Sequence, residues 1–407
     1  MKILHTADWH LGHKLFNADR EAEHQHVLDW LVDYIKEESI ELLIIAGDVF
    51  DTDSPPNFAR KQYYSFLCKL VDTCCRNVVV VAGNHDSANM LDASGEVLRL
   101  LNVHVIGNLP ENRKEQSIEI KDVKGKLQAV VGAVPYLRDR DIRQGVAGQS
   151  FDERLRALRL GIENHYQEIA DELEKYRKKN IPILVTGHFY VSGGERDGRP
   201  NSIHIGSLDV VDASCFSTLF DYVALGHLHR PQVVDKKQHI RYSGSLIPMD
   251  FNEWNYKQAV TLLEFEKKKL NKIQQIPVPL LRKLIYYQGE IDYIREKLSG
   301  LKTKEGLSNW LKIELITETY HPHLEEELMS LLADKNIEII LLNQIAPSNA
   351  NLLKQKQQQL QSLSDLDPVE VFQMKLDTAK INETEAREEL EHTFTELMNW
   401  MQERDNV

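Results

Sequence analysis

The sequence predicts a layered α/β fold in which two β-sheets pack against each other. From residue 1 to about residue 266, short apolar runs rich in β-branched residues alternate with segments of helical periodicity. In the later half of this stretch several strand candidates follow one another without a helix between them, which indicates a second sheet packed on the first. Five apolar runs lead into Asp, Asn or His. Because α/β folds build active sites at the carboxyl ends of strands, one shared site is expected there.

The spacing of apolar residues places the expected helices and strands. Leu28, Leu31 and Ile35 share one face of a helix expected between about residues 19 and 38. Further helices are expected at 57–72, 89–101 and 152–178. Strands are expected at 3–6, 42–46, 78–82, 127–134, 183–186, 222–225, 240–243 and 259–265.

A domain boundary is expected at Pro277 and Pro279, because two prolines so close together cannot continue a central strand. A first domain then covers residues 1–276. A small α+β domain is expected over 277–345, with helices near 292–298 and 324–332 and strands at 310–316 and 337–342. A polar linker rich in Gln and Asn (346–366) and a helical segment (367–407) complete the chain.

The helical segment contains two short amphipathic helices, the first opened by a capping Asp367 with Pro368 at its first position. Helices this short cannot bury an apolar face alone, so they either pack back on the chain or dock onto a partner such as a coiled coil. We expect that these helices dock onto a partner. The apolar positions that would bind it are Val369, Phe372, Leu376, Leu390, Phe394, Leu397, Met398 and Met401.

Composition and charge exclude several classes of protein. The net charge of −13 argues against a protein that coats nucleic acid through its overall field. It does not argue against a nucleic-acid enzyme, because bound metal ions can supply positive charge locally. The sequence has no apolar stretch long enough to span a bilayer and does not begin with the pattern of a signal peptide, so a cytoplasmic location is expected. Its four cysteines lack paired spacing and are expected to be reduced thiols.

The polar residues that follow the five apolar runs suit a two-metal centre for phosphoester cleavage. Such a reaction needs a nucleophile at neutral pH and neutralisation of the phosphate charge, and two divalent ions provide both. Carboxylates, neutral imidazoles and an amide oxygen are suitable ligands, and few extra anions are present to repel the substrate. Asp-x-His, Gly-Asp-x-x-Asp and a single Gly-His are weak signals alone, whereas Gly-Asn-His-Asp and Gly-His-x-His directly after an apolar strand are rarer. The whole set makes chance a poor explanation. The candidate metal ligands are Asp8, His10, Asp48, Asn84, His188, His227 and His229.

These motifs resemble those of the calcineurin-like binuclear metallophosphoesterases. The correspondence covers Asp-Trp-His at 8–10, Gly-Asp-Val-Phe-Asp at 47–51, Gly-Asn-His-Asp at 83–86, Gly-His at 187–188 and Gly-His-Leu-His at 226–229. The stretches 5–12, 47–52 and 224–230 are similar to a subgroup of DNA nucleases that act in double-strand-break repair. The resemblance implies a four-layer αββα sandwich at 1–276, with the small domain as a cap.

The resemblance also implies roles for the site residues. One metal ion is held by Asp8, His10, Asp48 and His229, and the other by Asp48, Asn84, His188 and His227, so that Asp48 bridges them. His85 stands beside the metals and orients the scissile phosphate or protonates the leaving 3′ oxygen. Mn²⁺ is the expected ion, with Mg²⁺, Fe²⁺ and Zn²⁺ open. At Asp51 some relatives carry a histidine linked to duplex ends, so that role is left open here.

The expected function is that of a metal-dependent DNA nuclease subunit in end processing, recombination and repair. The resemblance implies 3′ to 5′ exonuclease action on duplex ends, single-strand endonuclease action at hairpins, and a homodimer within a heterotetramer with a coiled-coil ATPase. The chain lacks a phosphate-binding Gly-x-x-x-x-Gly-Lys-Ser/Thr loop, so no nucleotide is expected on it. The alternatives are a phosphatase or phosphodiesterase of smaller substrates and a non-catalytic scaffold. Arg196 and Arg199 belong to a loop that either touches DNA or is simply solvated.

Overall fold

A computed structural model describes residues 1–142, 151–192, 211–302 and 306–345, together with Arg387, Leu390, Thr393 and Phe394. The chain divides into two compact units, Met1–Gln344 and Ile345–Val407. Among the described residues, no helix combines the length and the apolar character that crossing a membrane requires.

The first sheet of the larger unit joins parallel strands in its centre to antiparallel strands at one edge. Its strand order among the described residues is β16-β15-β1-β4-β5-β6, with β1, β4, β5 and β6 parallel and β15 and β16 antiparallel. Pro277 ends the edge strand β16, where a missing N–H costs no ladder bond to a further strand. The bounds are β1 Lys2–Thr6, β4 Leu42–Ala46, β5 Asn77–Val81, β6 Val103–Ile106, β15 Ala259–Glu266 and β16 Lys269–Pro277.

The second sheet has the order β13-β14-β12-β9-β8-β7 among the described residues. Its four central strands run parallel, and β7 and β13 are antiparallel at the edges. The bounds are β7 Ser117–Lys121, β8 Leu127–Gly132, β9 Ile183–His188, β12 Tyr222–Gly226, β13 Gln232–Val234 and β14 Lys237–Tyr242. Shorter elements near the sheets are β2 Lys14–Leu15, β3 Ala18–Asp19, α5 Asp139–Ile142, β10 Val191–Ser192 and β11 Val211–Asp212.

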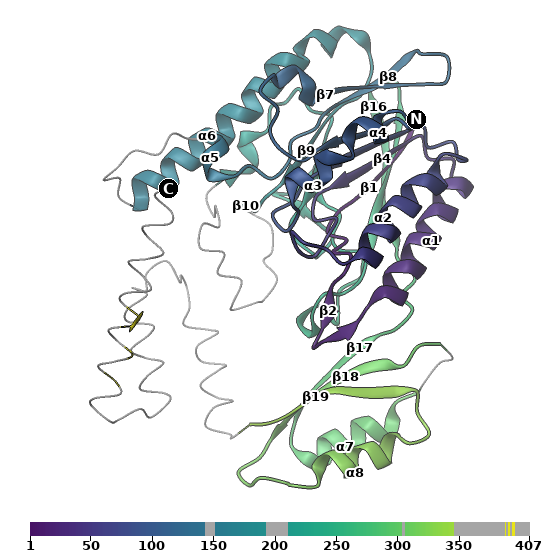
Figure 1. The fold of residues 1–407 in the computed structure, drawn as a ribbon, viewed down its shortest axis with the longest axis vertical. Helices are drawn as coiled ribbons and strands as arrows, with labels where there is room; N and C mark the ends of the chain where they lie inside the picture. The colour runs from purple at the N-terminus through teal and green to yellow at the C-terminus, as the bar shows by residue number, and fades with distance from the viewer. Residues whose placement is uncertain are drawn as a thin grey trace. The chain divides into compact units, whose positions relative to one another are not determined.

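Three apolar clusters define four layers. Helices α1 (Glu21–Glu37) and α2 (Asn57–Leu70) lie side by side on the outer face of the first sheet (Figure 1). Helix α6 (Phe151–Leu173) covers the outer face of the second sheet. A third cluster lies between the sheets, where Ile44 of β4 and Val131 of β8 are fully buried. The expected four-layer αββα sandwich is therefore confirmed.

A small α+β region follows the sandwich, and we call it the cap. Helices α7 and α8 pack on one face of its three-stranded sheet (Figure 1). The Arg282 guanidinium stacks 3.7 Å from the ring centroid of Trp310 and lies 3.3 Å from the Glu23 carboxylate of α1, which ties the cap to the sandwich. The bounds are β17 Leu284–Gly289, α7 Ile291–Gly300, β18 Asn309–Ile316, α8 Leu324–Leu332 and β19 Ile337–Ile345.

The structure differs from the sequence-based expectation at the helix after β5. The single helix expected at 89–101 is wrong, because α3 (Ala88–Ala93) ends at Ala93 and a second helix, α4 (Gly95–Arg99), begins after Ser94. The Ser94 hydroxyl donates a hydrogen bond to the Leu91 carbonyl at 3.1 Å, and a glycine follows, which has low helix propensity.

In the tail, Leu390 and Phe394 are helical, with Leu390 38% exposed. The other six expected partner-binding residues lie outside the described residues.

The Asp86 carboxylate fastens the loops that follow β4 and β5. It accepts hydrogen bonds from the backbone N–H groups of Val49 (3.1 Å), Phe50 (2.9 Å) and Gly83 (2.9 Å). Burial and the nearby Asp48 raise the pKa of Asp86 to about 6, and the three backbone donors oppose this rise. Each of these donors would otherwise be buried without a partner. Asp86 thus has a structural role.

We predict that Asp86→Asn lowers the free energy of unfolding by roughly 2–4 kcal/mol, because the amide offers one acceptor oxygen and turns an N–H₂ group toward buried donors. Urea denaturation in the presence of a chelator measures this. Asp122→Asn is the matched control, because Asp122 accepts the N–H groups of Lys124 and Lys126 in a turn at the surface. Equal stability of the two variants would contradict the structural role of Asp86.

Candidate metal centre

The five loops that carry the candidate ligands meet at the carboxyl ends of the parallel strands of both sheets. The loops after β1 and β4 are joined by backbone hydrogen bonds. Asp8 N–H donates to the Gly47 carbonyl at 3.0 Å, and the N–H groups of Trp9 and His10 donate to the Asp48 carbonyl at 2.8 and 3.0 Å. This pairing brings the first two motifs together independently of any side-chain contact.

Four of the candidate ligands have a left-handed backbone that is unfavourable for residues with a Cβ. Their φ angles are 53° for Asp8, 46° for His10, 49° for Asp48 and 103° for His227. Such conformations cost on the order of 1–3 kcal/mol each and cluster at functional sites. Here the surrounding hydrogen bonds stabilise these backbone conformations. Asp8 and His227, for example, are linked by a 2.8 Å bond from the His227 N–H to Asp8 Oδ1.

Two motif glycines are required by close packing rather than by flexibility. A Cβ at Gly83 would overlap the Asp48 carboxylate, and a Cβ at Gly226 would overlap the Ala46 carbonyl oxygen. Each glycine directly precedes a candidate ligand, Asn84 or His227. The Gly-Asn and Gly-His pairs in the sequence therefore reflect loops that approach each other too closely for a side chain.

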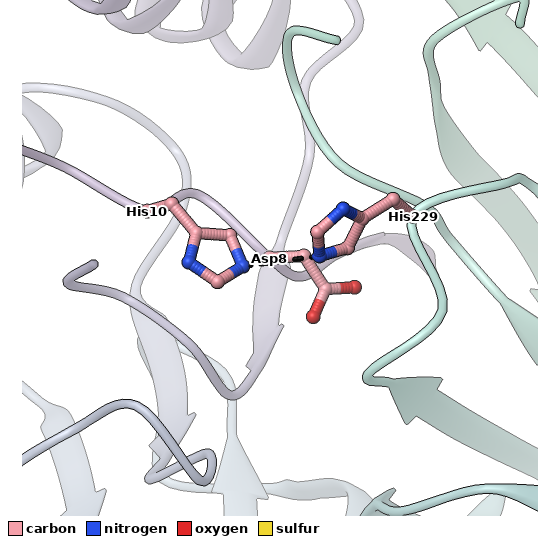
Figure 2. Close-up of side chains that lie close together, drawn as sticks. All are labelled: Asp8, His10 and His229. Atoms are coloured by element: carbon pink, nitrogen blue, oxygen red, sulfur yellow. Dashed lines mark hydrogen bonds between the residues drawn. The ribbon is translucent and has the colours of Figure 1, made fainter. Parts of the chain in front are cut away.

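Asp8, His10 and His229 form the first group of candidate ligands. Figure 2 shows the His10 and His229 rings directed toward each other beside the Asp8 carboxylate, and their Nε2 atoms lie 3.2 Å apart. One ligand atom from each residue lies within 4.8 Å of the other two. Asp8 Oδ2 is buried and has no hydrogen-bond partner within the described part of the chain. A buried carboxylate oxygen without a donor is typical of a cation site.

His188, His227 and Asn84 form the second group. His188 Nδ1–H donates to the Ala46 carbonyl at 2.8 Å, so its Nε2 faces Asn84 Oδ1 at 3.1 Å. His227 Nδ1 lies 3.0 Å from the same amide oxygen. An amide oxygen binds a hard cation without adding negative charge, which suits a site that must also accept an anionic substrate.

Asp48 lies between the two groups and contacts both. Its Oδ2 is 3.2 Å from His188 Nε2 and 3.6 Å from His10 Nε2, and its Oδ1 accepts the His85 N–H at 2.9 Å. Burial raises the pKa of the Asp48 carboxyl, but the neighbouring His188, His10 and His85 together lower it well below its ordinary value. Conversely, burial lowers the pKa of His188, but Asp48, Asp8 and the Ala46 carbonyl together raise it to about 9. An ion that binds His188 Nε2 therefore displaces a proton from it. The structure thus brings all seven candidate ligands together around one carboxylate.

This donor set fits two divalent cations. Burial lowers the pKa of His10 to about 4, so its imidazole is neutral and can act as a ligand at physiological pH. Burial raises the pKa of Asp8 to about 6, which shows that the carboxylate is poorly stabilised by its protein surroundings. A bound cation would stabilise it. Mixed oxygen and nitrogen donors of this kind suit first-row divalent ions.

His85 lies next to this set, and it forms a further group of possible metal ligands with His10 and Asp51. Its Nδ1–H donates to the Asp51 carbonyl at 2.9 Å, and its ring packs edge-on against His10 with 4.8 Å between centroids. The hydrogen bond fixes both the ring orientation and one ring proton. A half-buried imidazole so placed can act on a substrate bound at the metals.

Three residues orient these side chains in a way that sequence reasoning did not predict. Glu253 Oε1 lies 2.8 Å from His229 Nδ1, and Asp51 Oδ1 lies 3.0 Å from His13 Nδ1 and 3.4 Å from His10 Nδ1. No motif signals Glu253 or His13, because they act through contacts that only the fold creates. His5, outside the candidate set, is a buried imidazole whose Nδ1 lies 3.0 Å from the Tyr222 hydroxyl. His204, Arg196 and Arg199 lie outside the described residues.

Comparison with known proteins agrees with this geometry. Residues 1–231 match the family of calcineurin-like phosphoesterases, and residues 280–379 match a family described as the type 5 capsule protein repressor C-terminal domain. Among solved structures, one titled "GAP50 the anchor in the inner membrane complex of Plasmodium" aligns with a TM-score of 0.33 at 12% identity, covering 69% of this chain and 89% of that chain, which is too weak a likeness to bear on the fold.

Three curated relatives are each named as the SbcD component of the SbcCD nuclease. The Escherichia coli K12 protein is 34% identical over 401 residues, covering 98% of both chains. The Bacillus subtilis protein is 32% identical and covers 77% of this chain and 79% of its own. The Rhodobacter capsulatus protein is 36% identical and covers 69% and 71%. The chain therefore belongs to the calcineurin-like phosphoesterases and, within them, to the SbcD family of nucleases.

Proposed function

We propose that this chain is the metal-dependent DNA nuclease subunit of a complex with an SbcC-like ATPase. The observation that carries the proposal is the convergence of five loops on the Asp48 carboxylate, which contacts both groups of candidate ligands. Asp8, His10, Asp48 and His229 hold one ion, and Asp48, Asn84, His188 and His227 hold the other. Manganese is the proposed ion.

The reaction is phosphodiester hydrolysis. The two ions, when bound, generate a nucleophile from water at neutral pH and neutralise charge on the phosphate. The chain's own contribution is to hold the ligands rigidly and to provide His85. With Nδ1–H donated to the Asp51 carbonyl, the His85 ring can carry a second proton on Nε2 and give it to the departing 3′ oxygen. The products are a 3′ hydroxyl and a 5′ phosphate.

The substrate and partners follow from the family and from charge. We propose 3′ to 5′ exonuclease action on duplex ends and endonuclease action on hairpins and single strands, in the cytoplasm. With a net charge of −13, the chain has little general attraction for DNA. The ATPase partner therefore supplies much of the DNA grip and the nucleotide dependence, and two copies of each subunit form a heterotetramer.

The domain organisation is part of the same proposal. Residues 1–276 form the nuclease domain, 277–345 the cap, 346–366 a linker and 367–407 the partner-binding segment. The ion pair between Arg282 and Glu23 and the stacking of Arg282 on Trp310 support a cap that is firmly seated on the nuclease domain. A phosphatase of smaller substrates is not favoured by the relatives, which are named as nucleases.

We predict that His85→Gln reduces Mn²⁺-dependent cleavage of a labelled DNA hairpin about 100-fold or more, because general acid catalysis contributes on the order of 10²–10⁴-fold. Manganese binding should stay unchanged, since His85 is not a ligand in this proposal. His26→Gln, at an exposed position of α1, is the matched control and should cleave like the unmodified chain. Retention of full activity by His85→Gln would contradict its role.

A second prediction concerns the tail. Deletion of residues 366–407 should abolish binding to the ATPase partner while the isolated subunit keeps its manganese-dependent cleavage. Phe394→Asp, which leaves the chain length unchanged, should weaken the same interaction because it places a charge on the apolar face of the second tail helix. Pull-down with the partner and hairpin cleavage without it measure the two effects. Loss of both binding and intrinsic cleavage on deletion would count against a separate docking segment.

A further inference from the structure

A buried carboxylate outside the proposed ligand set lies directly against one of the ligands. Glu253 has no exposed surface and sits at the end of the 3₁₀ turn Phe251–Glu253. Its Oε1 lies 2.8 Å from His229 Nδ1, and its Oε2 accepts the Met249 N–H at 2.7 Å. Both oxygens of one fully buried side chain are therefore engaged, one of them by a residue of the metal centre.

These contacts determine which ring nitrogen of His229 carries the proton. A carboxylate can only accept, so the nitrogen that faces it, Nδ1, is the protonated one. The neutral ring then has its lone pair on Nε2, which lies 3.2 Å from His10 Nε2 and belongs to the group formed with Asp8. A histidine can bind a metal only through a nitrogen with a lone pair. The opposite tautomer would place a proton on the atom that has to bind.

The carboxylate itself is held in place from two sides. The Met249 N–H fixes Oε2. Phe251, two residues before Glu253, is 2% exposed and belongs to an apolar cluster with Leu15, Leu284 and Trp310. The 3₁₀ turn that carries Glu253 is therefore anchored against the first residues of the cap. An orienting group needs this kind of support to fix a ring within a fraction of an ångström.

We infer that Glu253 is a positioning residue of the metal centre, which holds His229 in the tautomer and orientation that present Nε2 to the ion bound with Asp8 and His10. This inference rests on the proposed two-metal function. It concerns the ion bound with His229, because His229 is the ligand whose Nδ1 Glu253 contacts. Partners of this kind commonly change metal affinity by about 10–100-fold.

Glu253→Gln is the most informative variant, because it changes the tautomer preference while keeping the shape. If the amide oxygen keeps the Met249 N–H, the amide N–H₂ group faces His229 Nδ1 and demands a lone pair there. The proton then moves to Nε2, where the ion has to bind. If instead the amide oxygen faces His229, the Met249 N–H meets another donor. Glu264→Gln is the matched control, since Glu264 lies on β15 and pairs only with the exposed Lys272 among the contacts described for it.

Manganese binding to the full-length chain, measured by titration calorimetry and by electron paramagnetic resonance, tests the inference. We expect one of two sites to weaken about 10–100-fold in Glu253→Gln, with the spectrum of a coupled ion pair replaced by that of a single ion. His229→Ala should lose the same site, and Glu264→Gln should keep both. A Glu253→Gln variant with two unweakened sites would overturn the inference.

A second measurement does not require Glu253→Gln to fold. Nitrogen NMR of the metal-free, unmodified chain labelled at histidine should show His229 protonated at Nδ1, assigned by its absence from His229→Ala. Protonation at Nε2 would overturn the inference. Failure of the proposed function has a different signature, because the unmodified chain would then bind fewer than two manganese ions or leave DNA uncleaved.

Discussion

The position of the Asp48 carboxylate is the constraint on which the rest of the site depends. It is buried between two groups of ligands contributed by both sheets, and its two oxygens contact His188, His10 and the His85 backbone. A buried anion in this place is tolerable only when cations or protons surround it. The strained backbones of Asp8, His10 and Asp48 can be understood as the cost of bringing several loops to one point.

Around this centre the structure uses carboxylates in distinct ways. Asp8 and Asp48 face the ligand groups, whereas Asp86 binds three backbone N–H groups and fastens the loops. Asp51 contacts the Nδ1 atom of His13, and Glu253 contacts the Nδ1 atom of His229. These carboxylates have the same chemistry, and their roles differ because each one has a different hydrogen-bond partner. A substrate that is itself anionic is tolerated because most of this negative charge already has a donor from the protein.

The sequence was sufficient to predict the layers and to predict which polar side chains lie together, and the reasons are physical. Parallel strands are buried on both faces, so their apolar runs are easy to recognise, and the polar residues after them must lie at one edge of a sheet. The break between α3 and α4 was missed because it depends on a side-chain cap at Ser94 that competes with a continuous apolar pattern. Glu253 was missed because its partner His229 is 24 residues away and the contact exists only in the folded chain. Leu390 and Phe394 are helical, but all eight tail positions stay predictions as partner-binding residues.

The most direct test of the central role of Asp48 is anomalous diffraction at the manganese absorption edge from crystals of the chain grown with Mn²⁺. We predict two peaks about 3.5–4 Å apart, both within bonding distance of the Asp48 carboxylate. One peak would be flanked by His10 and His229, and the other by Asn84 and His188. A single peak, or two peaks of which only one contacts Asp48, would contradict the account.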